Sequence, residues 1–456
     1  MCPSEASAST PEASAPSINA VKAVVEQHFP DLWPAVEAGL STCATLLLED
    51  NSNPVTLILC GASGCGKSTV TNMFDGVKIQ GKPFTYRSDK FTTASFVSHS
   101  AQATREQLQE VDLLPKIKNK VLLTPELSPI FRGKADDLTL CFSMLTRVLD
   151  GQGLMTDSGT HGQRGYEGPH IFAWIGATTP LDASVWDIMA TLGSRLFFLM
   201  LDTEEMTSIE DLVDSLTNEV SHSAGVVACK TVIGQFLDEL FTRHNGIAGV
   251  QWGASQNSRS ILQGIARFAE LMAVMRTPYK KDCKPMAETP RRANAVLYNM
   301  ARGHALVHGR RELTLDDLPL IALVASSSIP HNRRAILLAM ARNQGKPLTV
   351  HLVENALGVS RHTAEAAMEE MHWLGVGVFS KPGKGLTSTF ALKSKWDWFM
   401  SGEGLAFLQA ATWQNLGGER KPVTPQPLSS PDREREGKED VGSARIPRNL
   451  PGSPTP

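Results

Sequence analysis

Short, almost wholly apolar runs alternate along the chain with longer segments in which apolar residues recur every three or four positions. Residues 55–60, 121–124 and 171–177 are runs of the first kind, which are typical of strands buried on both faces of a parallel sheet. Residues 32–48 and 261–275 have the second spacing, which predicts helices with one buried face. Strands that alternate with helices predict an α/β fold, in which helices sandwich a parallel sheet.

The same pattern divides the chain into five segments. Residues 1–17 are rich in Ser, Ala and Pro, and residues 417–456 are rich in Pro, Ser and mixed charge, so we expect both to be disordered. Residues 18–203 contain the predicted strands, and residues 204–330 are mostly helical, as in an α-helical lid. Residues 331–400 predict three helices followed by a β-hairpin with a Gly/Lys tip, which is the layout of a winged helix-turn-helix domain.

The predicted strand at 55–60 leads directly into a glycine-rich loop with the pattern G-x-x-x-x-G-K-S. Such a loop turns its backbone N–H groups toward a polyphosphate, and the helix that follows adds the positive end of its dipole. In this arrangement Lys67 reaches the β- and γ-phosphates, and the Ser68 hydroxyl binds Mg²⁺. The pattern therefore predicts an ATP and Mg²⁺ site. Its expected nucleotide-contacting residues are Gly61, Ser63, Gly64, Cys65, Gly66, Lys67, Ser68 and Thr69.

A carboxylate follows the next buried strand. Residues 121–124 are followed by Pro125 and Glu126, and the carboxyl end of a parallel strand beside a P-loop is where a nucleotide hydrolase places the group that polarises water. Pro125 stands where the usual pattern has a metal-directing Asp. Three readings stay open: Glu126 performs both roles, or Mg²⁺ is held mainly by Ser68 and the phosphates, or hydrolysis is slow.

Composition and charge narrow the functional classes. The chain has 456 residues, of which 42% are hydrophobic and 20% are charged, as in a globular protein. No apolar run approaches the ~18 residues that span a bilayer, and the first residues lack the layout of a signal peptide, so we expect a cytoplasmic protein. The net charge of −3 argues against nucleic-acid binding by the whole surface. The seven cysteines never form a C-x-x-C pair, so they predict neither a disulfide framework nor a cysteine zinc site.

With these motifs in order, residues 18–330 resemble the AAA+ ATPases. Within them the chain is most similar to the branch that holds MoxR proteins, magnesium chelatases and minichromosome maintenance helicases. The matching segments are a Walker A motif at 61–68, a degenerate Walker B motif at 121–126, a β-hairpin insertion at 154–168, a sensor-1 turn with Thr179 where the family often has Asn, an arginine-finger box at Gly193-Ser194-Arg195 and a sensor-2 segment at Thr289-Pro290-Arg291-Arg292.

The resemblance implies a P-loop NTPase (AAA+) fold followed by an α-helical lid and the winged-helix domain. It also implies a homo-oligomeric ring or spiral with each nucleotide between two subunits. Arg195 would then serve the neighbour's nucleotide in trans, while Arg291 or Arg292 would act in cis. A positioned guanidinium stabilises the negative charge of phosphoryl transfer and contributes ~10³–10⁵ in rate. Glu126 and Thr179 complete the expected catalytic set.

Three functions remain open at this stage. The first is an ATP-driven nucleic-acid remodeller such as a helicase, loader or initiator, in which the winged helix touches DNA. Its expected contacts are Arg361, His362, Lys381 and Lys384, whereas Glu365, Glu369 and Glu370 on the same predicted helix repel phosphates. The second is a MoxR-like chaperone or ATP-dependent regulatory switch that acts on a protein partner. The third is a signalling or defence ATPase whose effector is a separate chain.

Overall fold

The computed structural model describes residues 16–98, 105–158, 162–193, 195–201, 213, 219–253, 257–280, 283–383 and 386–410. These residues belong to one compact unit, 1–418, and a second unit, 419–456, lies outside the described part. The expected disordered tail at 417–456 is therefore not described. At the other end, Ser17 caps helix α1 (Ile18–His28) by accepting a hydrogen bond from the Ala20 amide, so the first helix begins where the sequence predicts.

Five parallel strands form the central sheet, in the order β4-β5-β8-β1-β9. Their bounds are Thr85–Arg87 for β4, Val121–Thr124 for β5, Ala173–Thr178 for β8, Val55–Cys60 for β1 and Phe198–Met200 for β9. Every residue of β1, β5, β8 and β9 is buried. The predicted α/β sheet is confirmed, because the apolar runs in the sequence are strands with both faces covered.

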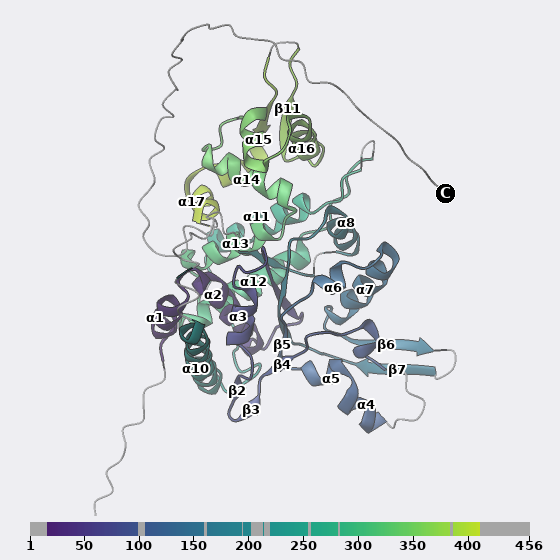
Figure 1. Ribbon diagram of the computed structural model, residues 1–456, viewed down its shortest axis with the longest axis vertical. Helices are drawn as coiled ribbons and strands as arrows, with labels where there is room; N and C mark the ends of the chain where they lie inside the picture. Colours follow the sequence, from purple (N-terminus) through teal and green to yellow (C-terminus); the bar gives the residue numbers. More distant parts are fainter. Residues whose placement is uncertain are drawn as a thin grey trace, which may run out of the picture. The chain divides into compact units, whose positions relative to one another are not determined.

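Successive residues of each strand enter two different cores. Leu57 and Leu59 pack into one hydrophobic cluster, whereas Ile58 between them packs into the other, because side chains alternate across a strand. The first cluster includes α2 (Trp33–Ala44), α3 (Lys67–Met73), α10 (Glu219–Arg243), α11 (Arg259–Met275), α12 (Arg291–Val307) and α13 (Leu318–Ser327). The second includes α5 (Leu113–Ile117), α6 (Ser128–Phe131), α7 (Ala135–Val148) and α8 (Ala183–Leu192). Figure 1 shows these helices around the sheet.

An antiparallel hairpin separates α7 from β8, as the sequence predicts. It pairs β6 (Gly153–Ser158) with β7 (Gly162–Glu167), beside α4 (Arg105–Val111) and α5 in Figure 1. Residues 159–161 at its tip lie outside the described part. A Cβ at Gly165, where φ is 138°, would lie 2.0 Å from the Leu154 carbonyl oxygen, so this register requires glycine. The Tyr166 hydroxyl donates to Asp112, 2.8 Å away, and fixes the hairpin base.

The remaining elements continue the same core. They are α14 (His331–Arg342), β10 (Leu348–Thr349), α15 (Val350–Leu357), α16 (Arg361–Trp373), β11 (Gly377–Ser380), β12 (Thr389–Leu392) and α17 (Gly402–Ala410), and a short β2–β3 pair (Lys78–Ile79, Lys82–Pro83) follows α3. The first cluster contains buried residues from Val21 to Leu408, so these C-terminal elements share it with the helices that pack on the sheet. Both expected boundaries, at 203 and 330, lie within the compact unit 1–418, and the division of the chain at these positions stays a prediction.

Three helices and an antiparallel sheet of order β10-β12-β11 make up residues 331–392. The element order agrees with the predicted three helices and hairpin, with β10 as an added strand. The lid and winged-helix assignments stay predictions. Among the described residues, every helix is too short or too polar to cross a bilayer.

Candidate nucleotide site

The loop between β1 and α3 has the backbone that its glycines predict. Gly64 and Gly66 adopt φ values of 87° and 89°, which residues with a side chain avoid. A Cβ at Gly61 would lie 2.7 Å from both the Cys65 Sγ and the Leu201 carbonyl oxygen. The three glycines of the motif are thus needed for the turn and for its close packing against the residue that follows β9.

Lys67 is folded back onto this loop. Its side chain is buried, and Nζ donates to the carbonyl oxygens of Gly61 at 2.8 Å and Ala62 at 2.5 Å. The hydroxyl-bearing Ser63 and Ser68 are exposed. Because phosphate oxygens are stronger acceptors for an ammonium than neutral carbonyls, Lys67 can exchange these internal partners for an incoming phosphate.

Glu126 and Thr179 lie on neighbouring strand ends and are linked by Ser128. The Leu127 amide donates to the Ala177 carbonyl oxygen at 2.7 Å, which holds the segment after β5 beside the end of β8. The exposed Glu126 accepts through Oε1 from the Ser128 amide at 2.7 Å. The Ser128 Oγ lies 3.0 Å from the Thr179 Oγ1 and accepts from the Thr179 amide at 3.1 Å. These three residues form one polar chain at the carboxyl edge of the sheet.

Sequence reasoning missed two members of this edge, Ser128 and Arg132. The exposed Arg132 donates from Nη2 to the Thr179 Oγ1 at 3.4 Å. The sequence does show that Ser128 stands two residues after Glu126, close enough for a local hydrogen bond. Its partner Thr179 follows a different strand, and only the β5–β8 pairing brings the two together.

The two predicted arginine sites meet at a single carboxylate. The Asp150 side chain lies 3.0 Å from the Arg195 Nε and 2.7 Å from an Arg292 guanidinium nitrogen, with Arg147 further away at 3.7 Å. Asp150 and Arg195 are each 15% exposed, and Arg292 is 32% exposed. Ser194 of the expected finger box lies outside the described residues, and Arg291 is exposed at the start of α12.

This cluster sits at the amino edge of the sheet, away from the P-loop. Thr56, near the start of β1, donates to the Arg195 carbonyl oxygen at 2.8 Å, whereas the P-loop begins after Cys60 at the other end. Five residues of extended strand separate Thr56 from the first residue of the P-loop, which corresponds to about 16 Å. Arg292 shares this carboxylate with Arg195, and the expected cis role of Arg291 or Arg292 stays a prediction that this contact does not test.

Two of the expected DNA-contacting cations, Arg361 on α16 and Lys381 after β11, are partly neutralised by a carboxylate of α16. Glu365 lies 2.6 Å from the Lys381 Nζ and 3.4 Å from the Arg361 Nε, and it accepts from Ser388 at 2.9 Å. The hydrogen bond from Lys381, followed by that from Ser388, lowers the pKa of Glu365 to about 2. His362 is exposed, and Lys384 lies outside the described residues.

A second acidic residue on α16 points into the protein instead of toward a ligand. Glu370 forms an ion pair with Arg333 of α14 at 2.5 Å, and Arg333 also donates to the Thr277 carbonyl oxygen at 2.8 Å. Glu370 therefore anchors α16 to the underlying helices. Of the three carboxylates expected to repel phosphates, Glu369 is exposed, whereas Glu365 and Glu370 are half-buried.

No family model matches the chain, and no curated protein matches it. A full-length MCM homolog from Methanopyrus kandleri aligns over 68% of this chain with 10% identity and a TM-score of 0.39, and the chain spans 61% of that protein's length. The SCCmec type IV Cch active helicase aligns over 85% of this chain and 72% of its own, with 10% identity and a TM-score of 0.34. The NrS-1 C-terminal region in an apo form aligns over 83% and 76%, with 11% identity and a TM-score of 0.24. Likeness at this level carries no argument about function, which rests on the residues described above.

Proposed function

We propose that this chain is an ATP-binding and ATP-hydrolysing enzyme that works as a homo-oligomer. The observation that carries the proposal is the loop after β1, in which Gly64 and Gly66 turn at positive φ and the buried Lys67 donates to the neutral carbonyl oxygens of Gly61 and Ala62. Such a loop matches what a polyphosphate requires: a cradle of backbone amides and a cation at its base.

The polar chain at the adjacent strand ends supports hydrolysis. Glu126 is exposed and is positioned by the Ser128 amide, so its second carboxylate oxygen can accept a hydrogen bond from an attacking water. Thr179 is fixed by Ser128 and contacts Arg132. The Ser68 hydroxyl and the Glu126 carboxylate are hard oxygen donors of the kind that Mg²⁺ prefers, and a bound Mg²⁺ would neutralise phosphate charge. Pro125 contributes no ligand, which favours slow turnover.

Arg195 and Arg292 would serve the nucleotide of a neighbouring subunit. Both contact Asp150 at the edge opposite the P-loop, and this shared partner supports a common role for the two. Asp150 would hold the two guanidinium groups in place until a γ-phosphate competes for them. Each positioned guanidinium would stabilise the charge that spreads over the equatorial oxygens during phosphoryl transfer.

The proposed substrate is nucleic acid, contacted through Arg361, His362, Lys381 and Lys384. The test is the ATPase rate with and without single- and double-stranded DNA over a salt series. We expect DNA to stimulate the rate, with a steep loss of affinity as salt rises. Glu365→Gln frees Lys381 and Arg361 and should tighten DNA binding more than Glu369→Gln, a matched change at an exposed position of the same helix. No stimulation, together with equal behaviour of the two variants, contradicts the DNA assignment.

A second candidate is a MoxR-like chaperone or ATP-dependent switch acting on a protein partner. Two observations favour it: Glu365 already pairs with Arg361 and Lys381, and Pro125 replaces a metal-directing carboxylate. In that case ATP should change the oligomeric state, while DNA should leave the ATPase rate unchanged at every salt concentration.

A further inference from the structure

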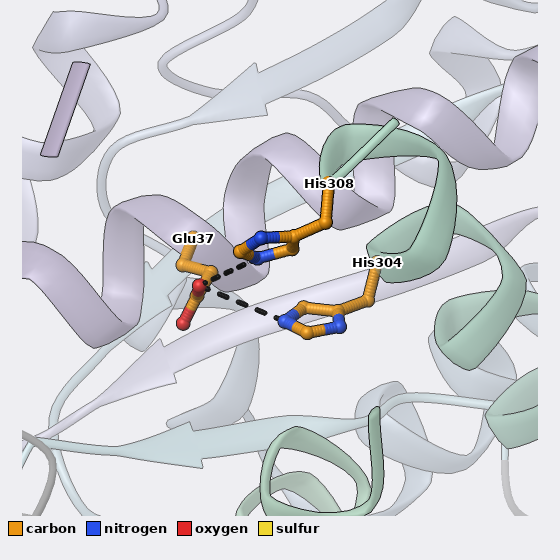
Figure 2. Close-up of side chains that lie close together, drawn as sticks. All are labelled: Glu37, His304 and His308. Carbon is orange, nitrogen blue, oxygen red and sulfur yellow. Dashed lines mark hydrogen bonds and ion pairs between the residues drawn. The ribbon is translucent and has the colours of Figure 1, made fainter. Parts of the chain in front are cut away.

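Three possible metal ligands lie close together between α2 and α12, and none of them belongs to the P-loop. They are Glu37 on α2, His304 on α12, and His308, which caps the carboxyl end of α12 four residues after His304. Their ligand atoms all lie within 4.8 Å of one another. Figure 2 shows both imidazoles turned toward the Glu37 carboxylate. A pair of histidines at positions i and i+4 puts two nitrogen ligands on one helix face.

The spacing of these atoms suits a tetrahedral ion. The Glu37 Oε1 lies 3.0 Å from the His308 Nε2 and 3.6 Å from the His304 Nε2. Zinc bonds to histidine nitrogen and carboxylate oxygen are 2.0–2.2 Å long, which places tetrahedral ligands about 3.3 Å apart. The observed separations bracket that value.

The imidazole of His304 is oriented by a buried carboxylate behind it. Its Nδ1 lies 2.6 Å from Asp317, which is fully buried. A carboxylate accepts hydrogen bonds, so Nδ1 carries the proton and Nε2 points at Glu37. Asp317 is itself held by Arg310 at 2.7 Å and by the Thr314 amide at 2.7 Å. Histidines that bind zinc commonly donate their other ring N–H to a carboxylate in this way.

The surrounding packing holds the ligands in place and leaves them accessible. A Cβ at Gly303, next to His304, would lie 2.2 Å from the Ser41 carbonyl oxygen, so α2 and α12 approach each other as closely as glycine permits. Arg302 on α12 also bonds Asp50, just before β1, at 2.8 Å. The side chains of Glu37 and His308 are 20% and 29% exposed, which gives an ion a route from solvent and a position for a water ligand.

We propose that Glu37, His304 and His308 bind a divalent transition-metal ion of the zinc class, which fastens α2 to α12. Two imidazole nitrogens and one carboxylate oxygen match Zn²⁺ and Co²⁺ and do not match Mg²⁺, which prefers oxygen ligands. With three protein ligands, the fourth position belongs to water. The site is independent of the proposed nucleotide chemistry.

The competing explanation is a proton-bridged network. Although burial lowers the pKa of His304, hydrogen bonds to Asp317 and Glu37 outweigh that effect and raise its pKa to about 9. Burial raises the pKa of Glu37, and the hydrogen bonds from both histidines lower it overall to about 2. A charged His304 between two carboxylates would also hold the helices together, and it would need no metal.

Cobalt titration distinguishes the two. The full-length chain is stripped with chelator, kept free of nucleotide and titrated with Co²⁺ in excess Mg²⁺, while the visible absorption of tetrahedral Co²⁺ is followed. We expect one Co²⁺ per chain, displaced by one equivalent of Zn²⁺. Glu37→Gln and His308→Ala should each weaken binding about tenfold or more. His351→Ala, which removes an imidazole that is 75% exposed, should bind as the wild type does.

A second readout covers the case in which a variant folds poorly. Zn²⁺ should raise the thermal midpoint of the wild type and of His351→Ala, since a ligand that binds the folded state stabilises it, and chelator should reverse the shift. The proposal is overturned if the wild type takes up no stoichiometric Co²⁺, or if Glu37→Gln and His308→Ala bind it as tightly as the wild type.

Discussion

At the scale of single residues, the site is built from side chains that are held by local bonds and can change partners. Lys67 donates to two carbonyl oxygens of its own loop, and Glu126 is bonded through one of its oxygens to the Ser128 amide. Neither contact joins distant parts of the fold. Substituting these residues should therefore change chemistry far more than stability.

Lys67→Ala should lose nucleotide binding while the fold remains. The variant removes the ammonium that meets phosphate, so we expect ATP affinity to fall about tenfold or more, which corresponds to about 1.4 kcal/mol or more. Binding of a fluorescent ATP analogue and the thermal midpoint are the measurements. Lys78→Ala, which removes an exposed lysine after the same helix, is the control. Wild-type affinity in Lys67→Ala would contradict the P-loop assignment.

Glu126→Gln should keep ATP binding and stall turnover. The amide keeps the shape of the side chain but cannot accept a proton, so we expect the rate to fall by about 10²–10⁴ and an ATP-bound oligomer to accumulate in size-exclusion chromatography. Glu110→Gln, at an exposed position on α4, should behave as the wild type. If Glu126→Gln turns over at the wild-type rate, another carboxylate performs this role, and Asp89 and Asp157 are the next to test.

At the scale of elements, ion pairs decide how α16 presents its charges. Glu370 ties the helix to Arg333 of α14, and Glu365 ties it to Lys381, which follows β11. The sequence shows Glu365, Glu369 and Glu370 on one predicted helix. It cannot show which carboxylate faces inward, because that depends on the rotation of α16 against α14.

Acid should weaken this region through Glu365. Its pKa is about 2 in the folded chain, primarily because of the hydrogen bond from Lys381, whereas the pKa of an unfolded Glu is about 4.3. A carboxyl with a lowered folded pKa stabilises the protein above its unfolded pKa, and that contribution is lost as pH falls toward the folded pKa. Between pH 5 and pH 2, roughly the interval set by these values, the urea midpoint of the wild type should drop more than that of Glu365→Gln. Parallel curves for the two proteins would contradict this role.

At the scale of the whole molecule, the sequence predicts which segments are strands and does not predict how they are ordered. Residues 121–124 and 171–177 are identified as strands by their apolar runs, because a strand that is buried on both faces consists almost wholly of apolar residues. Those runs carry no information about neighbours, and β8 between β5 and β1 is what brings Thr179 to Ser128. The P-loop, like the strands, can be predicted from the local sequence, because its glycines are required by the local backbone conformation.

The sequence does not predict side-chain contacts between residues that are far apart in the chain. Arg292 follows the expected sensor-2 pattern, yet its partner is Asp150 at the amino edge of the sheet. His304 and His308 carry a visible helical spacing, but Glu37 lies 271 positions before His308. Such pairs depend on how α12 packs against segments that are distant in the sequence, and a local sequence pattern does not specify that packing.

The central claim is that each nucleotide is hydrolysed between two copies of this chain, and mixed-subunit ATPase tests it most directly. Arg195→Ala should bind ATP normally and hydrolyse it poorly, while Arg147→Ala, which alters the more exposed and more distant partner of Asp150, should keep its activity. Mixing Arg195→Ala with Lys67→Ala should restore activity, because only the mixture can join an intact P-loop to an intact arginine. If Arg195 instead serves only as a partly buried ion pair, Arg195→Ala should lose several kcal/mol of stability. A large fall in its thermal midpoint with no rescue on mixing would contradict the account.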